Sequence, residues 1–238
     1  MKFGSEKQIL GCRRGDIRNL LDFKGEKISK FNQGMKKFPL FAISVLGGAS
    51  ISIGGIVFIN TPNAIAGSFL FSLGLFLVCH FKWGLYTGRV QNLVEVSVKS
   101  AVPELITVYL GNLLGTLLFG YLTLFCGKPF AISKVAELAQ YKLSLPPLSV
   151  LVLSFFCGIM MYVAVTGFKK IEDPIGKHLV VVLPVMVFIM SGFEHSIADL
   201  FYISAANEWG LDAIKFSIIA ALGNLLGGCL IPVFDKIK

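Results

Sequence analysis

Charged residues are scarce in this chain. Only 15% of its 238 residues are Asp, Glu, Lys or Arg, whereas about a quarter is usual in a soluble domain. The uncharged residues form long runs at 38–81, 105–127, 143–168, 178–193 and 216–234. A helix needs roughly 20 apolar residues to cross the hydrocarbon core of a bilayer. The scarcity of charge therefore excludes an ordinary soluble domain and indicates an integral membrane protein surrounded by a lipid bilayer.

Six transmembrane helices are predicted from these runs. The first run is long enough for two crossings, and the turn-forming stretch "NTPN" (60–63) divides it. We therefore predict an all-α integral membrane protein with spans at about 38–60, 64–98, 101–127, 146–168, 177–206 and 212–234. The second and fifth spans are longer than a crossing needs, and both contain polar residues midway.

The chain lacks the residue clusters of metal sites and enzymes. Its cysteines are scattered without a CxxC spacing, so we interpret them as packing residues and expect neither disulfides nor a metal site. It also has no nucleophile–base set and no phosphate-binding loop, and the loop at 169–177 is too short to hold an active site. We expect neither an enzyme nor a bound cofactor.

Positive charge is distributed unevenly between the two sides of the predicted spans. Residues 1–37 are basic and lack the apolar stretch of a cleavable signal peptide, and their periodicity predicts a short amphipathic helix on the anionic leaflet. With this segment inside, sixteen Lys and Arg residues lie on the inner side and four on the outer side. Both termini are therefore predicted to be cytoplasmic. Topology accounts for the net charge of +8, so no nucleic-acid partner is expected.

A short motif occurs twice in the chain. "LGNLLGTLL" (110–118) recurs as "LGNLLGGCL" (222–230), and the copies fall in the third and sixth predicted spans. Gly111 with Gly115, and the matching glycines of the second copy, are spaced for close contact between helices. A chance recurrence of a small-residue motif is the weaker interpretation, because the six-residue cores are identical and occupy matching spans.

The repeat predicts how the chain is divided. Three spans in each copy invert the second copy relative to the first, which is the plan of many channels and transporters. The predicted segments are a cytoplasmic N-terminal segment, a first three-helix repeat, an external loop and a second three-helix repeat, at 1–37, 38–127, 128–145 and 146–236.

The repeat also makes the second and fifth spans partners, each with a break near the membrane centre. The second contains "KWGLYTGR" (82–89) and the fifth contains "MSGFEHS" (190–196), and each offers glycine and a hydroxyl residue where a helix can unwind. Broken backbone is tolerated at membrane depth only where it is buried or lines a cavity. Two half-helix N-termini pointing at a common centre would suit a small anion.

These residues resemble the formate/nitrite transporter family. The stretch "SGFEHSIAD" (191–199) is close to a signature of that family, and further pieces occur in the family's order, namely "FSLGL", "LYTG", "YLGNLLG", "MMYVAV" and "LPVMVF". The resemblance covers about residues 28–236. It implies an aquaporin-like protomer in a homopentamer of the bacterial cytoplasmic membrane. Each protomer would have its own pore for a small monovalent anion, most of all formate, with nitrite or hydrosulfide as alternatives.

The resemblance also implies roles for individual residues. His195 matches the central pore histidine, Glu194 the glutamate beside it, Thr87 the threonine of the second-span break, and Lys142 a vestibule lysine in the external loop. The apolar constrictions would be formed by Phe71, Leu75, Leu85, Tyr86 and Phe188, with Tyr86 where phenylalanine is usual.

Four positions depart from the family's pattern. Asparagine is common where this chain has Gly158 and Asp199, an acidic residue usually stands at Gly84, and Asn, Ser or Thr is usual at Arg89. Asp199 lies one helical turn beyond His195, and Arg89 falls in the first turn of the opposing half-helix. We hypothesise that Arg89 and Asp199 compensate each other across the pore centre. The alternative is that Arg89 faces the pore and broadens the range of anions.

His195 would have a chemical task in such a pore. A bare anion crosses an apolar constriction only at a desolvation cost of several kcal/mol or more. A histidine titrates near physiological pH and can donate a proton or a hydrogen bond to a weak acid. Thr87 would bond His195 or the anion, or cap the second half-helix, and Glu194 would accept N–H groups of the broken backbone. A conduit for a small neutral or cationic solute is the competing interpretation, because the polar residues around the pore are altered.

Overall fold

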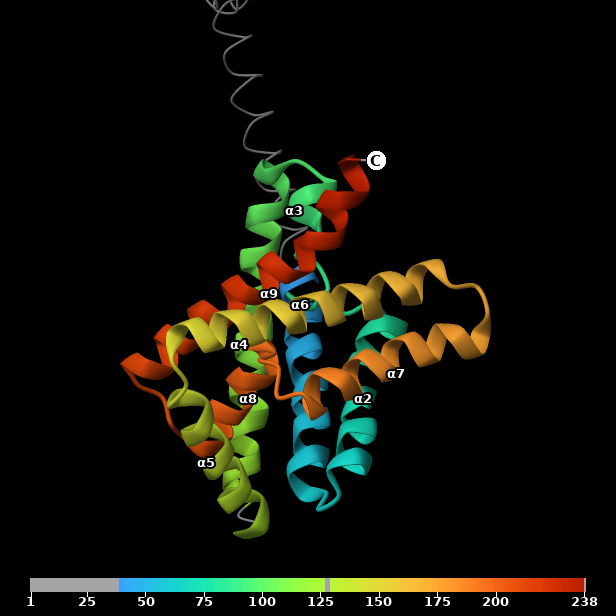
Figure 1. Ribbon diagram of the computed structural model, residues 1–238. Coiled ribbons are helices and arrows are strands. Elements are labelled where there is room, and N and C mark those ends of the chain that lie inside the picture. Colours follow the sequence, from blue (N-terminus) through green and yellow to red (C-terminus); the bar gives the residue numbers. More distant parts are fainter. Residues whose placement is uncertain (1–38, 127–128, 238) are drawn as a thin grey trace, which may run out of the picture. The chain divides into compact units, whose positions relative to one another are not determined.

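The described part of the chain is built of helices. The structure is a computed structural model that describes residues 39–126 and 129–237, so the helix expected within residues 1–37 lies outside the described residues. The described residues contain no β-strand. Figure 1 shows a first helix, Pro39–Asn60, followed by α2 (Ala64–Phe81), α3 (Asn92–Glu95), α4 (Val98–Phe125), α5 (Pro129–Leu143), α6 (Pro147–Lys170), α7 (Pro174–Met190), α8 (Ser196–Ala206) and α9 (Leu211–Ile237).

Five of these helices are long and apolar enough to cross a membrane, where six crossings are predicted from the sequence. They are the first helix, α2, α4, α6 and α9. The span predicted over 177–206 is divided between α7 and α8, each too short by itself. The span predicted over 64–98 is a continuous helix only as far as Phe81, and the short helix α3 follows after a break. The segment predicted as an external loop, 128–145, contains the helix α5.

Left-handed residues stop two helices at the polar stretches. Lys82 follows α2 with a φ of 56°, and its N–H donates to the carbonyl of Val78. Gly192 follows α7 with a φ of 65°, a conformation that glycine adopts without the usual steric cost. Each helix therefore ends at a defined residue, and the chain changes direction there.

The chain has a different structure after each of the two breaks. After the second break, α8 is a regular helix of 11 residues. After the first, residues 85–91 form successive tight turns, in which Gly88 N–H donates to Leu85 O and Arg89 N–H to Tyr86 O, and α3 has only 4 residues. The predicted pair of half-helix N-termini is therefore wrong, because only α8 is a half-helix.

Glycines of the repeated motif bring helices into close contact, as the sequence predicts. A Cβ atom at Gly115 would lie 2.2 Å from the carbonyl oxygen of Val45 in the first helix. A Cβ atom at Gly227 would lie 1.9 Å from the carbonyl oxygen of Phe155 in α6. Neither position can hold a side chain, so α4 packs against the first helix and α9 against α6 through glycine.

The asparagine at the centre of each motif binds the broken backbone. Asn112 accepts from the N–H of Tyr86 at 2.9 Å, and donates to the carbonyls of Gly84 at 2.8 Å and Ser44 at 2.7 Å. One side chain therefore joins the first helix, α4 and the segment that follows α2.

Asn224 makes the equivalent set of bonds in the second half of the chain. It accepts from the N–H of Ser196 at 2.8 Å, and donates to the carbonyls of Glu194 at 2.9 Å and Ser154 at 2.8 Å. Both amides are fully buried. The sequence repeat therefore corresponds to a structural repeat at the two places where the helices break.

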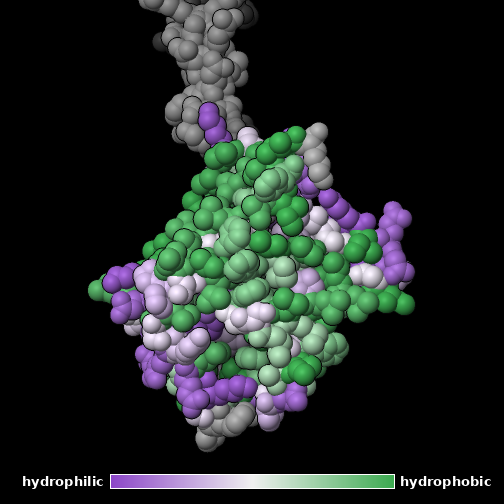
Figure 2. Space-filling view, viewed as in Figure 1, coloured by the Kyte–Doolittle hydropathy of each residue, from purple (hydrophilic) through white to green (hydrophobic). Residues whose placement is uncertain are grey.

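Apolar side chains face outward along α4 and α9. Figure 2 shows apolar residues over much of the face that these helices present. The exposed side chains recur about one turn apart, at Val102, Ile106, Leu110, Leu114 and Leu118 in α4 and at Ile214, Ile218, Leu222 and Leu226 in α9. An outer surface of this kind fits surroundings of hydrocarbon rather than water.

Replacing either amide should destabilise the fold strongly. Asn112→Ala or Asn224→Ala leaves two buried backbone groups of the break without partners and removes a third bond to a carbonyl of a neighbouring helix. We therefore expect a loss of about 3 kcal/mol or more in the free energy of unfolding. Thermal unfolding of the purified protein in detergent measures the loss. Asn60→Ala is the control, because Asn60 is exposed and makes one bond, to Ile56 O, within its own helix. Equal stability of Asn112→Ala and Asn60→Ala would contradict the prediction.

Candidate functional site

His195 stands between the break and the start of α8. Its ring Nδ1 accepts from the N–H of Ala198 at 3.1 Å, so the proton of the neutral imidazole is on Nε2. Nε2 lies 2.9 Å from Thr87 Oγ1, which belongs to the first break. The predicted hydrogen bond between Thr87 and His195 is therefore present, and it links the two breaks. Both side chains are buried.

Apolar residues surround the His195 ring. Phe188 of α7 is stacked on it, with ring centroids 5.4 Å apart and an interplanar angle of 21°. Phe71 of α2 meets Phe188 edge to face at 6.0 Å. Leu75 lies one turn from Phe71 along α2 and is also buried. An anion beside His195 would have few partners other than the histidine, Thr87 and the polar residues of the adjacent cavity.

Two cavities flank this region. The smaller has a volume of about 100 Å³ and is lined by residues that include Phe71, Phe188, Lys142, Glu194, His195 and Asp199. The larger has a volume of about 470 Å³, and Leu85, Gly88 and Arg89 line it together with the C-terminal turn of α2. Along α2, Phe71 therefore faces one cavity and Val78 the other, with Leu75 between them. Thr87 lies between Leu85 and Gly88, which line the larger cavity, and bonds His195, which lines the smaller one.

Lys142 is buried beside His195, in the last turn of α5. Its Nζ lies 2.9 Å from Asp199 Oδ1 and also donates to Glu194 Oε2. The other oxygen of Asp199, Oδ2, is buried and has no hydrogen-bond partner among the described residues. One lysine therefore stands against two carboxylates in the wall of the smaller cavity.

The hypothesis that Arg89 compensates Asp199 is wrong in this structure. Arg89 Nη1 lies 2.5 Å from Glu104 Oε1 in α4, and Asn92 donates to the same oxygen at 3.3 Å. The tight turns after Thr87 direct Arg89 toward α4 and away from α8. The counter-charge of Asp199 is Lys142, which α5 places against α8.

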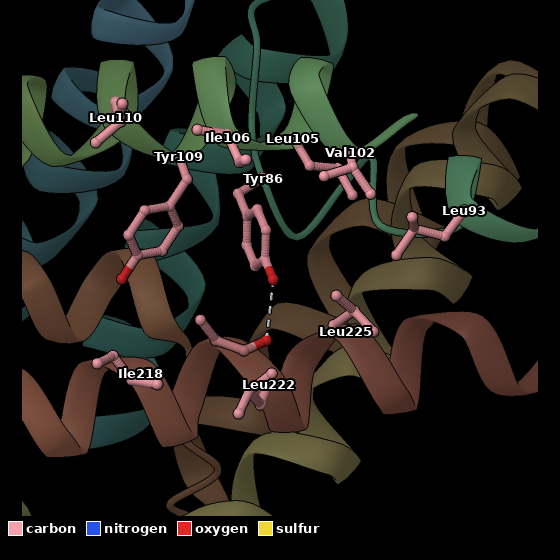
Figure 3. A pocket seen from close by; sticks show the side chains of 11 residues that line it. Tyr86, Leu93, Val102, Leu105, Ile106, Tyr109, Leu110, Ile218, Leu222 and Leu225 are labelled. Atoms are coloured by element: carbon pink, nitrogen blue, oxygen red, sulfur yellow. Dashed lines mark hydrogen bonds between the residues drawn. The ribbon is translucent and has the colours of Figure 1, made fainter. Parts of the chain in front are cut away.

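Tyr86 also lies elsewhere than expected. Its hydroxyl donates to the carbonyl of Ala221 at 3.1 Å, and its ring meets Tyr109 edge to face at 5.1 Å. Figure 3 shows the ring in a third cavity, between α4 and α9. That cavity has a volume of about 320 Å³ and is lined almost entirely by apolar side chains. Tyr86 lines neither cavity beside His195, so its ring does not lie at the pore constriction where it was expected.

Two departures from the family pattern have packing explanations. A Cβ atom at Gly158 would lie 2.3 Å from the carbonyl oxygen of Asn224, so no side chain fits there while α6 and α9 pack this closely. A Cβ atom at Gly84 would lie 2.1 Å from Ser44 Oγ, and the carbonyl of Gly84 accepts from Asn112. Both positions support the breaks, and Gly158 lines neither cavity beside His195.

Three residues of this region were not singled out from the sequence. Asn112 and Asn224 hold the breaks, and their signal was available, because each is the one polar residue at the centre of a repeated apolar motif. Glu104, the partner of Arg89, gave no comparable signal. It lies near the start of an apolar run, where a solvated carboxylate is ordinary.

Known proteins of similar sequence are channels and transporters. The formate channel FocA of Haemophilus influenzae is 25% identical over 89% of this chain and 90% of its own length. The uncharacterised transporter YrhG of Bacillus subtilis is 29% identical over 83% of this chain and 85% of its own. The formate channel FocA of Escherichia coli K12 is 29% identical over 70% of this chain and 66% of its own.

Solved structures share the fold. A pentameric formate channel with formate bound matches with a TM-score of 0.75 at 23% identity, over 85% of this chain and 97% of the other. An FNT family ion channel matches with a TM-score of 0.77 at 21% identity, over 86% of this chain and 91% of the other.

The family model for formate/nitrite transporters matches residues 24–234, which is most of the chain. That match is consistent with membrane-spanning helices, helix breaks held by the repeated motif, and a buried histidine between two cavities. The chain is a multi-pass membrane protein and belongs to the formate/nitrite transporter family.

Proposed function

We propose that this protein is a channel or transporter for small monovalent anions of weak acids, most of all formate, with nitrite and hydrosulfide as alternatives. The observation that carries the proposal is the Thr87–His195 pair, buried between two cavities. Phe71, Leu75, Leu85 and Phe188 form the apolar part of the route. Lys142, Glu194 and Asp199 form the polar wall on one side.

The proposed protomer is aquaporin-like, with the chain crossing the membrane six times as an inverted 3+3 repeat. Support comes from the matched bonds of Asn112 and Asn224 and from the structural neighbours. In this scheme α7 and α8 together make one crossing, α2 and the segment after it make another, and the segment boundaries are those given by the sequence. We place both termini in the cytoplasm, the protein in a bacterial cytoplasmic membrane, and five copies in one assembly.

His195 would lower the cost of moving charge through the apolar interval. Its Nε2–H can leave Thr87 and donate to the anion. The hydroxyl of Thr87 can then donate to the same anion. The N–H at the start of α8 that bonds Nδ1 keeps the ring oriented. For the anion to become its neutral acid, His195 would first take up a proton from the aqueous side, pass a proton from Nε2 to the anion and return to the neutral ring. The neutral acid crosses apolar surroundings at much lower cost.

A second candidate is a conduit for a small neutral or cationic solute. The observation that favours it is the ratio of one lysine to two carboxylates in the smaller cavity. If all three are charged, this wall is net negative and repels an anion. Whether removing the charge of Asp199 raises or lowers anion flux therefore distinguishes the two candidates.

Removing the imidazole should slow formate transport. In proteoliposomes, His195→Ala should reduce the uptake of labelled formate by roughly 100-fold, because an average general acid contributes that much. Uptake is measured at two pH values, with nitrite and hydrosulfide as competitors. The control is His178→Asn, since His178 lines neither cavity beside His195. Wild-type uptake no faster than in empty liposomes would overturn the proposed function.

Removing the charge of Asp199 should speed the entry of an anion. Asp199→Asn keeps the shape of the side chain and makes the wall around Lys142 more positive, so we expect formate uptake to rise by about tenfold. The matched control is Asp212→Asn, because Asp212 is exposed and its one ion-pair partner among the described residues is Lys215 on α9. A fall in formate uptake together with a fall in the flux of a small cation would favour the second candidate.

A further inference from the structure

The larger cavity carries positive charge that no described residue compensates. Lys82, Lys169 and Lys177 line it, and none of them forms an ion pair with any residue that the structure describes. Arg89 also lines it, but is paired with Glu104. No described residue of the lining carries a carboxylate. Three like charges around one cavity repel one another, and a bound anion would relieve that repulsion.

The charge of this cavity fits an anion with more than one negative charge. A monovalent anion would leave most of the repulsion among the three ammonium groups in place. A phosphate-bearing anion offers several strong acceptor oxygens, and charge-assisted hydrogen bonds to lysine are among the stronger ones in proteins. The smaller cavity is different, since its one lysine already has two carboxylate partners.

Two aromatic side chains lie in the same lining. The Trp83 ring is stacked on Phe81, with centroids 5.1 Å apart. Phe168 has Lys177 Nζ over its ring at 4.6 Å. A cavity of about 470 Å³ with aromatic surface next to unpaired lysines matches a molecule that joins a flat ring to phosphates.

We propose that this cavity binds a phosphorylated metabolite of the nucleotide class, which closes the route without crossing it. In the proposed orientation the cavity faces the cytoplasm, where such anions occur. Leu85 belongs to the lining and precedes Thr87, so an occupant would stand directly in front of the Thr87–His195 pair. The closure rests on the proposed function, whereas the binding does not.

Cys79 provides a reporter of binding that needs no transport. It lines the same cavity and is half-buried. In the full-length chain, Cys12, Cys126 and Cys229 are replaced by Ser and the buried Cys157 by Ala, which leaves one thiol. The rate of its modification is then measured with anionic sulfonatoethyl and cationic trimethylammonioethyl methanethiosulfonate. The anionic reagent should react faster, and ATP should protect the thiol.

The lysines are tested together. Lys82→Gln, Lys169→Gln and Lys177→Gln combined should weaken protection by ATP at least about tenfold and remove the preference for the anionic reagent. Lys170→Gln is the matched control, because Lys170 is exposed next to Lys169 but does not line the cavity. Absence of protection by millimolar ATP, or protection that survives the triple replacement, would overturn the proposal.

Further arms identify the source of the phosphate chemistry. ATP should protect better than tripolyphosphate, and Trp83→Leu should remove that advantage; equal protection would contradict the contact with the aromatic rings. Protection by phosphatidylglycerol vesicles but not by ATP would mean that a lipid headgroup fills the site, which contradicts the proposal. Formate uptake with ATP on the cytoplasmic side tests closure. If ATP protects Cys79 but the wild type transports no formate, the proposed function fails and the binding site stands.

Discussion

A helix that ends inside apolar surroundings leaves backbone N–H and C=O groups without partners, and the rest of this structure depends on how those groups are bonded. Leaving them unpaired costs several kcal/mol. The side-chain amides of Asn112 and Asn224 each accept one hydrogen bond and donate two. Each amide also bonds a neighbouring helix, so the break is fixed in position as well as satisfied.

The functional geometry follows from the fixed breaks. Because Asn112 holds the backbone at Gly84 and Tyr86, Thr87 is presented at a fixed place, and because Asn224 holds Glu194 and Ser196, so is His195. The 2.9 Å contact between Thr87 and His195 is thus the meeting point of two separately anchored segments. The close packing through Gly115 and Gly227 brings α4 and α9 near enough for their asparagines to reach the breaks.

The sequence was sufficient for the features that depend on local patterns. Uncharged runs located the helices, glycine and polar residues located the breaks, and the repeated motif located the close helix contacts. Features that depend on which helices pack against each other were not predicted from the sequence. Arg89 found its carboxylate on α4 because tight turns replace the expected half-helix, and no periodic pattern in residues 85–91 indicates such turns. Lys142 was expected in a loop, but α5 carries it into a buried place, where long-range packing alone selects its partners.

The two cavities beside His195 differ in charge, and in the proposed pore they would have different tasks. In the proposed pore, lysines line the wider cavity, where screening weakens their attraction for a monovalent anion, so formate would gather there without being held strongly. Beside His195 the surroundings are apolar, and an uncompensated lysine there would bind a small anion too tightly to release it. Two carboxylates against Lys142 reduce that attraction. In the proposed pore, anions would be attracted where the attraction is weak and reversible. The desolvated interval would rely on a neutral imidazole, whose single N–H stabilises an anion without trapping it.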